Sequence, residues 1–157
     1  TKQARQNKLQ QKPIILWFTG LSGAGKTTTA DALEKALFSM GYSTYLLDGD
    51  CIRRGLNADL SFSKEDTREN NRRVGEVAKI LLDTGVFPIV SSISPSRQDR
   101  EMVRSMVEPN EFIEIFVNTP LKVCEDRDSK GLYKKARAGQ IANMAGIDRL
   151  YEPPLNP

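Results

Sequence analysis

One eight-residue segment constrains the fold of this chain more than any other. Residues 20–27, Gly-Leu-Ser-Gly-Ala-Gly-Lys-Thr, match the phosphate-binding pattern G-x-x-x-x-G-K-[ST] at every fixed position. The apolar residues 14–18 precede the segment, as expected of a buried strand, and apolar residues at helical spacing follow it up to Met40. Strand, glycine loop and helix form the context in which this pattern has a mechanism. The segment therefore predicts a phosphate loop that binds a nucleoside triphosphate.

The residues of this phosphate loop have separable roles. Glycines let successive backbone N–H groups converge on one anion, and the positive N-terminal end of the following helix adds to the attraction. Lys26 would supply a cation for the β- and γ-phosphates, and the Thr27 hydroxyl is placed to bind Mg²⁺. The alternative is a glycine-rich turn with a surface lysine, which the flanking strand and helix disfavour. The residues assigned to triphosphate binding are Gly20, Leu21, Ser22, Gly23, Ala24, Gly25, Lys26, Thr27 and Thr28.

The composition excludes several classes of protein. With 157 residues, of which 39% are hydrophobic and 27% charged, the chain suits one domain with a single core. No apolar run approaches the roughly 18 residues of a membrane-spanning helix, and a net charge of +3 is too small to indicate a nucleic-acid partner. Two cysteines, Cys51 and Cys124, form neither a disulfide framework nor a zinc motif, which favours a reduced, cytoplasmic protein. Because the chain has no histidine, a general base must be a carboxylate, or a hydroxyl or amine with a shifted pKa.

Apolar strand patterns alternate with helical patterns along the chain. This alternation predicts an α/β fold, the three-layer α/β/α arrangement of P-loop NTPases with a mostly parallel central sheet. Pro88 cannot donate to a strand ladder and suggests an edge strand or a bulge. Thr119 and Pro120 are expected to begin a helix that runs to Arg127. The expected strands cover residues 14–18, 42–47, 86–93 and 112–117.

Two segments stand outside this alternation. Residues 1–12 are expected to form a polar arm in front of a domain that covers residues 13–157. Since the chain does not begin with Met, we expect it to be trimmed or to be one domain of a longer polypeptide. Residues 128–149 are rich in Lys, Arg and Gly and predict a mobile lid over the site. Their basic character suits an anionic ligand, although a solvated surface is the alternative.

Two carboxylates follow the second expected strand. Asp48 and Asp50 lie at its carboxyl end, where ligands bind in open α/β sheets. Asp-Gly-Asp is also a common turn sequence. The alternative to a simple turn is that one carboxylate accepts a proton from an attacking hydroxyl while the other orients Mg²⁺ or substrate. The chain has no Asn-Lys-x-Asp guanine motif, and a basic lid favours a small-molecule kinase over a GTPase switch.

Longer motifs narrow the function. Most distinctive are Leu47-Asp-Gly-Asp50, Ile93-Ser-Pro95 and Lys130-Gly-Leu-Tyr-Lys-Lys-Ala-Arg-Ala-Gly139. From residue 16 to residue 154 the chain resembles the adenylylsulfate kinases, P-loop kinases that phosphorylate the ribose 3′-hydroxyl of adenosine 5′-phosphosulfate (APS). The resemblance implies ATP as co-substrate, Mg²⁺ as cofactor, and ADP and 3′-phosphoadenosine 5′-phosphosulfate (PAPS) as products. It also implies a cytoplasmic protein without nucleic-acid or membrane partners, either a homodimer or one fused to or associated with ATP sulfurylase.

The resemblance also assigns roles to single residues. Asp48 would be the general base and an outer contact of the Mg²⁺ that Thr27 binds, and Asp50 would help to place substrate and metal. Ser94 matches a serine that takes up phosphate in some members, although direct in-line transfer needs no such intermediate. Lys26 would be catalytic, and the residues assigned to ATP beyond the phosphate loop are Arg127, near the ATP base, and Arg137 of the lid. The residues assigned to APS are Asp50, Arg53, Phe62, Asn70, Ile93, Ser94, Lys134 and Met144.

Two positions depart from the family pattern. Thr67 stands where the family has a substrate-binding arginine, and Arg68 follows it one residue later. Because one step along a helix turns a side chain by about 100°, Arg68 is not an automatic substitute. Met144 stands where the family has an aromatic residue that stacks on adenine, a contact worth roughly 1–3 kcal/mol per base. These changes leave open a kinase for another nucleotide-like acceptor, or a non-catalytic nucleotide-binding regulatory domain.

Overall fold

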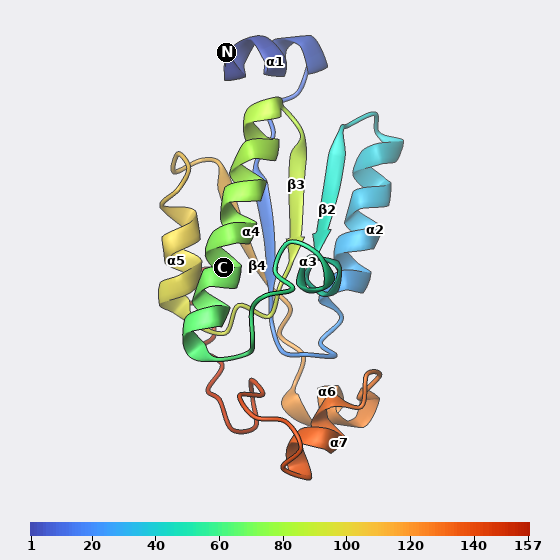
Figure 1. Cartoon of the computed structure of the whole chain (residues 1–157). Coiled ribbons are helices and arrows are strands. Elements are labelled where there is room, and N and C mark those ends of the chain that lie inside the picture. Colours follow the sequence, from blue (N-terminus) through green and yellow to red (C-terminus); the bar gives the residue numbers. More distant parts are fainter.

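The computed structural model describes residues 1–157 and arranges them in three layers around a parallel sheet (Figure 1). The strands lie in the order β2-β3-β1-β4, and all three neighbouring pairs are parallel. The expected α/β/α fold is therefore confirmed. The strands are β1 (Ile15–Thr19), β2 (Thr44–Asp48), β3 (Phe87–Ser91) and β4 (Phe112–Phe116).

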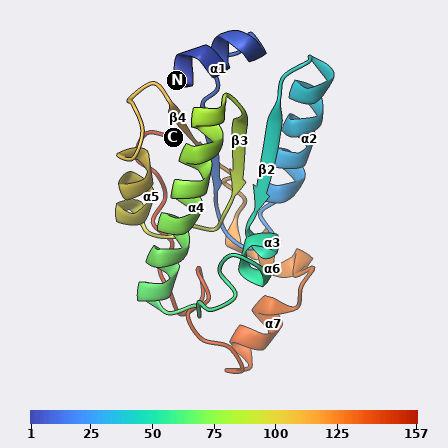
Figure 2. The same cartoon turned by 45° about the horizontal axis from the view of Figure 1, so that its top comes forward.

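Helices cover both faces of the sheet (Figure 2). Helix α2 (Lys26–Ser39) packs on one face, and helices α4 (Lys64–Thr84) and α5 (Arg97–Arg104) pack on the other. Four further helices complete the chain: α1 (Lys2–Leu9), α3 (Gly49–Arg54), α6 (Leu121–Arg127) and α7 (Leu132–Arg137). None of the helices combines the length and the apolar character that crossing a membrane requires.

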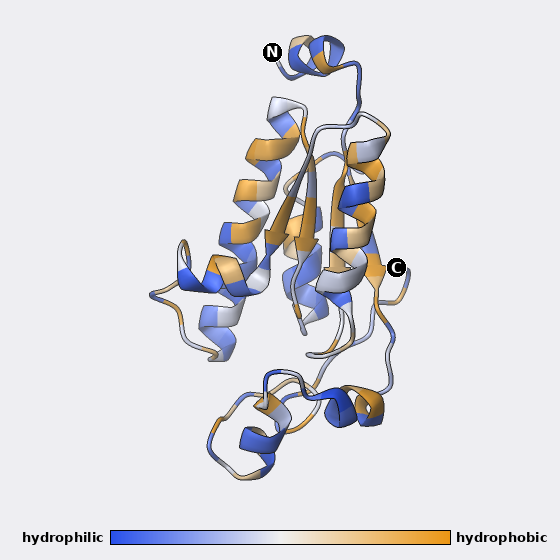
Figure 3. Cartoon of the chain, turned by 90° about the vertical axis from the view of Figure 1, so that its right-hand side faces the viewer, coloured by the Kyte–Doolittle hydropathy of each residue, from blue (hydrophilic) through white to orange (hydrophobic).

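Strand β1 is buried on both faces, which explains its unbroken run of apolar residues. Ile15 and Trp17 belong to the core between the sheet and α4 and α5, whereas Leu16 and Phe18 belong to the core under α2. Successive side chains of a strand point to opposite faces, so a strand between two helical layers needs apolar residues at every position. The strands are accordingly mostly hydrophobic (Figure 3).

The strands all end at the same edge of the sheet. The phosphate loop, α3, α6 and α7 gather at this edge, and α1 lies at the opposite end (Figure 1). This arrangement follows from parallel strands, whose carboxyl ends share one edge. The polar residues 1–12 contribute α1, and Gln11 joins this segment to the domain by accepting from Ser43 N over 2.9 Å.

Two local expectations are wrong. Strand β3 is not an edge strand, because it lies between β2 and β1. Pro88 is tolerated there because no hydrogen bond of the sheet needs its missing N–H. The preceding Phe87 N donates to Ser43 O on the β2 side, and the pairing with β1 begins only at Ile89. Helix α6 begins after Pro120, not at a Thr119 cap. The Thr119 hydroxyl instead donates to Ala24 O at 2.8 Å, a tertiary contact that the local sequence does not announce.

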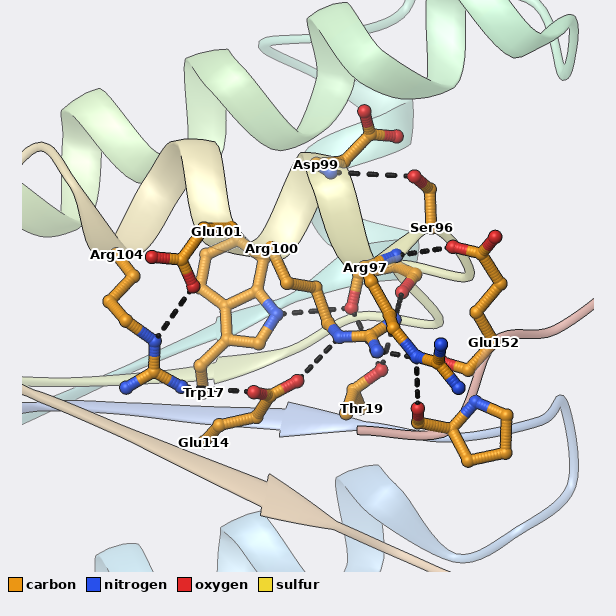
Figure 4. A network of polar contacts seen from close by, with 12 residues as sticks. Trp17, Thr19, Ser96, Arg97, Asp99, Arg100, Glu101, Arg104, Glu114 and Glu152 are labelled. Atoms are coloured by element: carbon orange, nitrogen blue, oxygen red, sulfur yellow. Dashed lines mark hydrogen bonds and ion pairs between the residues drawn. The ribbon is translucent and has the colours of Figure 1, made fainter. Parts of the chain in front are cut away.

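A buried arginine ties the C-terminal segment to the sheet (Figure 4). The Arg100 side chain pairs with Glu114 of β4 and donates to Ser94 O and to Glu152 O, both at 2.6 Å. Glu152 N donates in turn to Pro95 O at 2.9 Å. A buried charge is tolerated only when it is paired and fully hydrogen-bonded, as Arg100 is. The network therefore fixes the last residues of the chain against the loop that follows β3.

Candidate functional site

The phosphate loop has the backbone geometry that its glycines predict. Gly20, Gly23 and Gly25 have φ angles of 148°, 72° and 104°, which L-residues with side chains rarely adopt. At Gly20 a Cβ atom would lie 2.7 Å from the carbonyl oxygen of Val117. Helix α2 begins directly after the loop, at Lys26. The loop and the helix N-terminus can therefore point their N–H groups at one anion.

Lys26 lies almost buried at this loop, with 8% of its surface exposed. Its Nζ donates to Leu21 O at 2.8 Å. Burial, and to a smaller extent the nearby Lys130, lower the pKa of Lys26 from 10.5 to about 8 against the attraction of Asp50 and Asp48. The site thus holds a partly desolvated ammonium group that can exchange a carbonyl partner for a phosphate oxygen.

Three oxygen-bearing side chains meet at the carboxyl edge of the sheet. Thr27 Oγ1 donates to Asp48 Oδ1 at 3.0 Å and shares a 2.9 Å hydrogen bond with Ser91 Oγ. Asp48 also caps α3 by accepting from Cys51 N at 3.3 Å. The carboxylate that ends β2 is therefore adjacent to the hydroxyl that follows the phosphate-loop lysine.

These side chains suit a Mg²⁺ ion that is shared with substrate better than a metal ion bound by protein ligands alone. No group of three or more His, Cys, Asp or Glu side chains converges anywhere in the chain. Mg²⁺ is commonly bound by one or two protein oxygens together with water and substrate phosphates. The Thr27 hydroxyl and the Asp48 carboxylate offer such a set.

Residues predicted for the acceptor nucleotide gather beside α3. The Arg53 guanidinium lies 4.4 Å from the ring centroid of Phe62 and donates to Ser61 O at 2.7 Å. Burial lowers the pKa of Arg53. Phe62 is 63% exposed, so part of its ring surface is open to a ligand. The predicted Asn70 is buried, and its Oδ1 accepts from Asn57 Nδ2 at 2.9 Å.

The segment predicted as a lid contacts the phosphate loop. Tyr133 of α7 donates its hydroxyl proton to Ser22 O at 2.9 Å, and Arg127, which directly precedes the segment, donates to Gly23 O at 3.1 Å. Lys130 pairs with Asp50, which spans the site from the lid to α3. Arg137 is instead paired with Glu125, and the Lys134 side chain is exposed.

Two predicted site residues are enclosed rather than open to the loop. Met144 is 7% exposed and packs in a cluster with Ala24, Cys124 and Tyr133. The Ser94 hydroxyl accepts from Trp17 Nε1 at 3.0 Å and donates to Thr19 Oγ1 at 3.0 Å. Next to it, Ile93 O accepts from Thr19 Oγ1 at 2.8 Å. The Ser94 hydroxyl is thus committed to internal partners.

Three residues at the site were not predicted from the sequence. Ser91 pairs in register with Asp48, so its position at the end of β3 could have revealed it. Tyr133 belongs to a quoted motif but had no assigned role. Arg149 donates to Thr67 Oγ1 at 2.8 Å across 82 residues of sequence, and no sequence signal announces that contact.

Comparisons with known proteins agree with this geometry. The family model described as adenylylsulphate kinase matches residues 12–157. The adenylyl-sulfate kinase of Vibrio vulnificus (strain YJ016) is 60% identical over 157 residues, which is all of this chain and 76% of that protein. The adenylyl-sulfate kinase of Yersinia pestis is 57% identical over all of this chain and 74% of its own length.

A solved structure agrees as well. The Mycobacterium tuberculosis APS kinase in complex with AMPPNP and APS superposes with a TM-score of 0.89 at 48% sequence identity, over 93% of this chain and 86% of that one. A Sinorhizobium meliloti gluconokinase has a TM-score of 0.55 at 18% identity over 92% of this chain and 85% of its own, which shows the shared fold alone. On the matched motifs, the fold and these relatives, the chain belongs to the adenylylsulfate kinase family.

Proposed function

We propose that the protein transfers the γ-phosphoryl group of ATP to the 3′-hydroxyl of APS and releases PAPS and ADP. The observation that supports this most is the hydrogen bond of 3.0 Å between Thr27 and Asp48. It joins the phosphate loop to a carboxylate that can act as a base. The relative of known structure that carries APS and an ATP analogue together supports the same pair of substrates.

The phosphate loop would hold the triphosphate by its N–H groups. Lys26 would leave Leu21 O and pair with the β- and γ-phosphates, which repays the cost of its burial. Thr27, together with Asp48 or Asp50, would hold Mg²⁺, whose positive charge would stabilise the phosphates when it is bound. Arg127 lies against the loop and would contribute to the same site.

Asp48 would accept the proton of the 3′-hydroxyl as its oxygen attacks the γ-phosphorus. The bond between the γ-phosphorus and the bridging oxygen breaks, and ADP leaves with that electron pair. Direct transfer needs no covalent intermediate, and the internal hydrogen bonds of Ser94 support this route. Asp50 would be free for substrate once its pair with Lys130 opens.

The acceptor would bind on the α3 side of the site. Phe62 offers an exposed ring for stacking on adenine, and Arg53 supports the ring from its other face. Asn70 and the Ile93–Ser94 backbone would contact the rest of the nucleotide. Lys134 and Arg137 of α7 would approach the phosphates from the lid, residues 128–149, and Met144 would pack near the purine. We propose this arrangement on the family resemblance together with the Arg53–Phe62 contact.

The resemblance also motivates proposals about the setting of the reaction. We propose a cytoplasmic enzyme, and either a homodimer or a chain that associates with ATP sulfurylase. The hexameric APS kinase of Thiobacillus denitrificans, 34% identical with a TM-score of 0.64 over 88% of this chain and 32% of that one, supports an oligomer. Cross-linking and sedimentation of the purified chain would test it.

A coupled assay for ADP release tests the proposed reaction. We expect Mg²⁺-dependent turnover with APS and none above background with AMP or CMP. Turnover with another nucleotide and not with APS would favour the alternative acceptor, which Thr67 and Met144 motivate. Calorimetric binding of PAPS without any turnover would favour a regulatory nucleotide-binding domain.

Replacing Asp48 by Asn tests the proposed base. Asn caps helices as well as Asp does, so α3 should still form. We expect kcat to fall by about a hundredfold to ten-thousandfold, while the Kd for ATP stays within about threefold, the range expected when no phosphate contact is removed. The matched control is Asp126→Asn on the exposed surface of α6, which should change neither quantity. Near-wild-type turnover of Asp48→Asn would assign the base to another group.

A further inference from the structure

An arginine from the C-terminal segment lies where helix α4 lacks one. Arg149 donates from a terminal guanidinium nitrogen to Thr67 Oγ1 at 2.8 Å. The Thr67 hydroxyl gives its own proton to Ser63 O at 2.7 Å, so it is available as an acceptor for Arg149. Thr67 is the position at which the family resemblance predicts a substrate-binding arginine. A guanidinium group is therefore present at this point, but it comes from a different part of the chain.

The surroundings of Arg149 suit an anionic ligand. Neither Arg149 nor Arg53 forms a direct ion pair, although Asp66 lies near enough to attract Arg53 and Asp99 near enough to attract Arg149. The two guanidinium groups are close enough that Arg149 lowers the pKa of Arg53, an effect smaller than that of burial and than the opposing attraction of Asp66. Two guanidinium groups near one another repel, and an anion bound between them would relieve that repulsion.

The backbone around Arg149 is fixed before any ligand binds. The Asp148 carboxylate accepts from Asn143 N at 2.7 Å and from Met144 N at 2.6 Å, which closes a turn around residues 143–149. On the other side, Glu152 is held by the buried Arg100 (Figure 4). A side chain on such a rigid segment loses less conformational freedom when it binds.

The neighbouring Arg68 is differently placed. It follows Thr67 on α4 but is exposed, and it makes no hydrogen bond or ion pair. One residue along a helix turns the side chain by about 100°, away from Thr67. Thr67 and the predicted acceptor residue Asn70, by contrast, are one turn apart and share a face of α4.

We propose that Arg149 binds the anionic 5′ end of the acceptor nucleotide and so replaces the α4 arginine that the family pattern predicts at position 67. The inference rests on the proposed function, because it names a further residue of the acceptor site. A guanidinium group can donate two parallel hydrogen bonds to phosphate or sulfate oxygens, which a threonine hydroxyl cannot. In this chain the acceptor would therefore contact α3, α4 and the C-terminal segment together.

Steady-state kinetics of three variants test the proposal. Arg149→Gln should raise KM for APS about tenfold or more, with kcat and KM for ATP within about twofold. Arg68→Gln is the matched control and should leave all three constants within about twofold. The double variant Thr67→Arg/Arg149→Gln returns an arginine to α4 and should recover most of the lost affinity. Equal effects of Arg149→Gln and Arg68→Gln, or an effect of Arg68→Gln alone, would overturn the assignment.

Competitive inhibition separates charge recognition from a structural role. AMP carries a 5′ anion that adenosine lacks, so the ratio of their inhibition constants reports the anion contact. We expect Arg149→Gln to reduce the preference for AMP by about tenfold while adenosine inhibition is unchanged. Equal weakening of both inhibitors would mean that Arg149 only supports the fold, and would refute the proposal. If the unmodified protein does not turn over APS, the proposed function fails first, and the AMP-to-adenosine ratio still tests the anion contact.

Discussion

Lys26 offers a test in which stability and activity should change in opposite directions. Its ammonium group is 8% exposed, and burial lowers its pKa from 10.5 to about 8. A drop of this size corresponds to about 3 kcal/mol of unfavourable free energy in the folded state. Replacing Lys26 by Met removes that cost but leaves Leu21 O without its 2.8 Å partner, a loss of about 1 kcal/mol. The variant should therefore be more stable than wild type by about 2 kcal/mol at pH 7.

The sign of the pH dependence follows from proton binding. The folded protein binds this proton less tightly than the unfolded chain does, so the cost of burial is fully present below pH 8 and disappears as the pH rises toward 10.5. The stability advantage of Lys26→Met should accordingly be largest at pH 7 and be lost above pH 10. Turnover should fall at least a hundredfold, because the transferring phosphate loses its cation.

Urea denaturation without nucleotide, at pH 7 and at pH 10, measures the effect. The control is Lys122→Met, in which an exposed lysine paired with Asp126 is removed, and its stability should change by less than about 1 kcal/mol. If Lys26→Met is less stable than wild type at pH 7, burial does not strain this lysine and the reasoning is wrong.

Two further variants address the loop and the buried serine. Gly20→Ala would bring a Cβ atom to 2.7 Å from Val117 O at a φ of +148°, so it should lower thermal stability and ATP affinity. The control Gly41→Ala has no atom within 4 Å of its Cβ and should cost only backbone strain of about 1 kcal/mol. Equal losses in both variants would contradict the steric argument. Ser94→Ala should cost about 1–3 kcal/mol of unfolding free energy because Trp17 Nε1 loses its acceptor, yet leave kcat within a few-fold. Loss of turnover in a stable Ser94→Ala protein would instead support a phosphoserine intermediate.

Local sequence patterns were sufficient for the order and type of the main elements. The strand around Trp17 and the helix that follows the phosphate loop were found because their apolar spacing repeats over neighbouring residues. Short helices such as α3 and α7 were missed, because six residues give too few turns for a period to show. The position of Pro88 was predicted wrongly because its missing N–H destabilises a strand only where a neighbouring strand needs that donor. The sequence of one strand does not reveal where its pairing with β1 begins.

The candidate site was predictable to the extent that its residues adjoin strand ends. Asp48 and Thr27 were expected near one another because parallel strands bring their carboxyl ends to one edge, and they are bonded at 3.0 Å. The burial of Met144 and the internal partners of Ser94 were not predictable, because both depend on segments that pack from elsewhere in the chain.

The amino-acid sequence by itself determined the phosphate loop, the parallel sheet and the family, because each of these can be recognised from short runs of consecutive residues. Only the tertiary structure decided which distant side chains meet. The contact of Arg149 with Thr67 is the clearest case, since the turn around Asp148 and the buried Arg100 bring the C-terminal segment to α4. A side chain's partner depends on how the chain is packed in space, and residue spacing along the sequence carries no record of that.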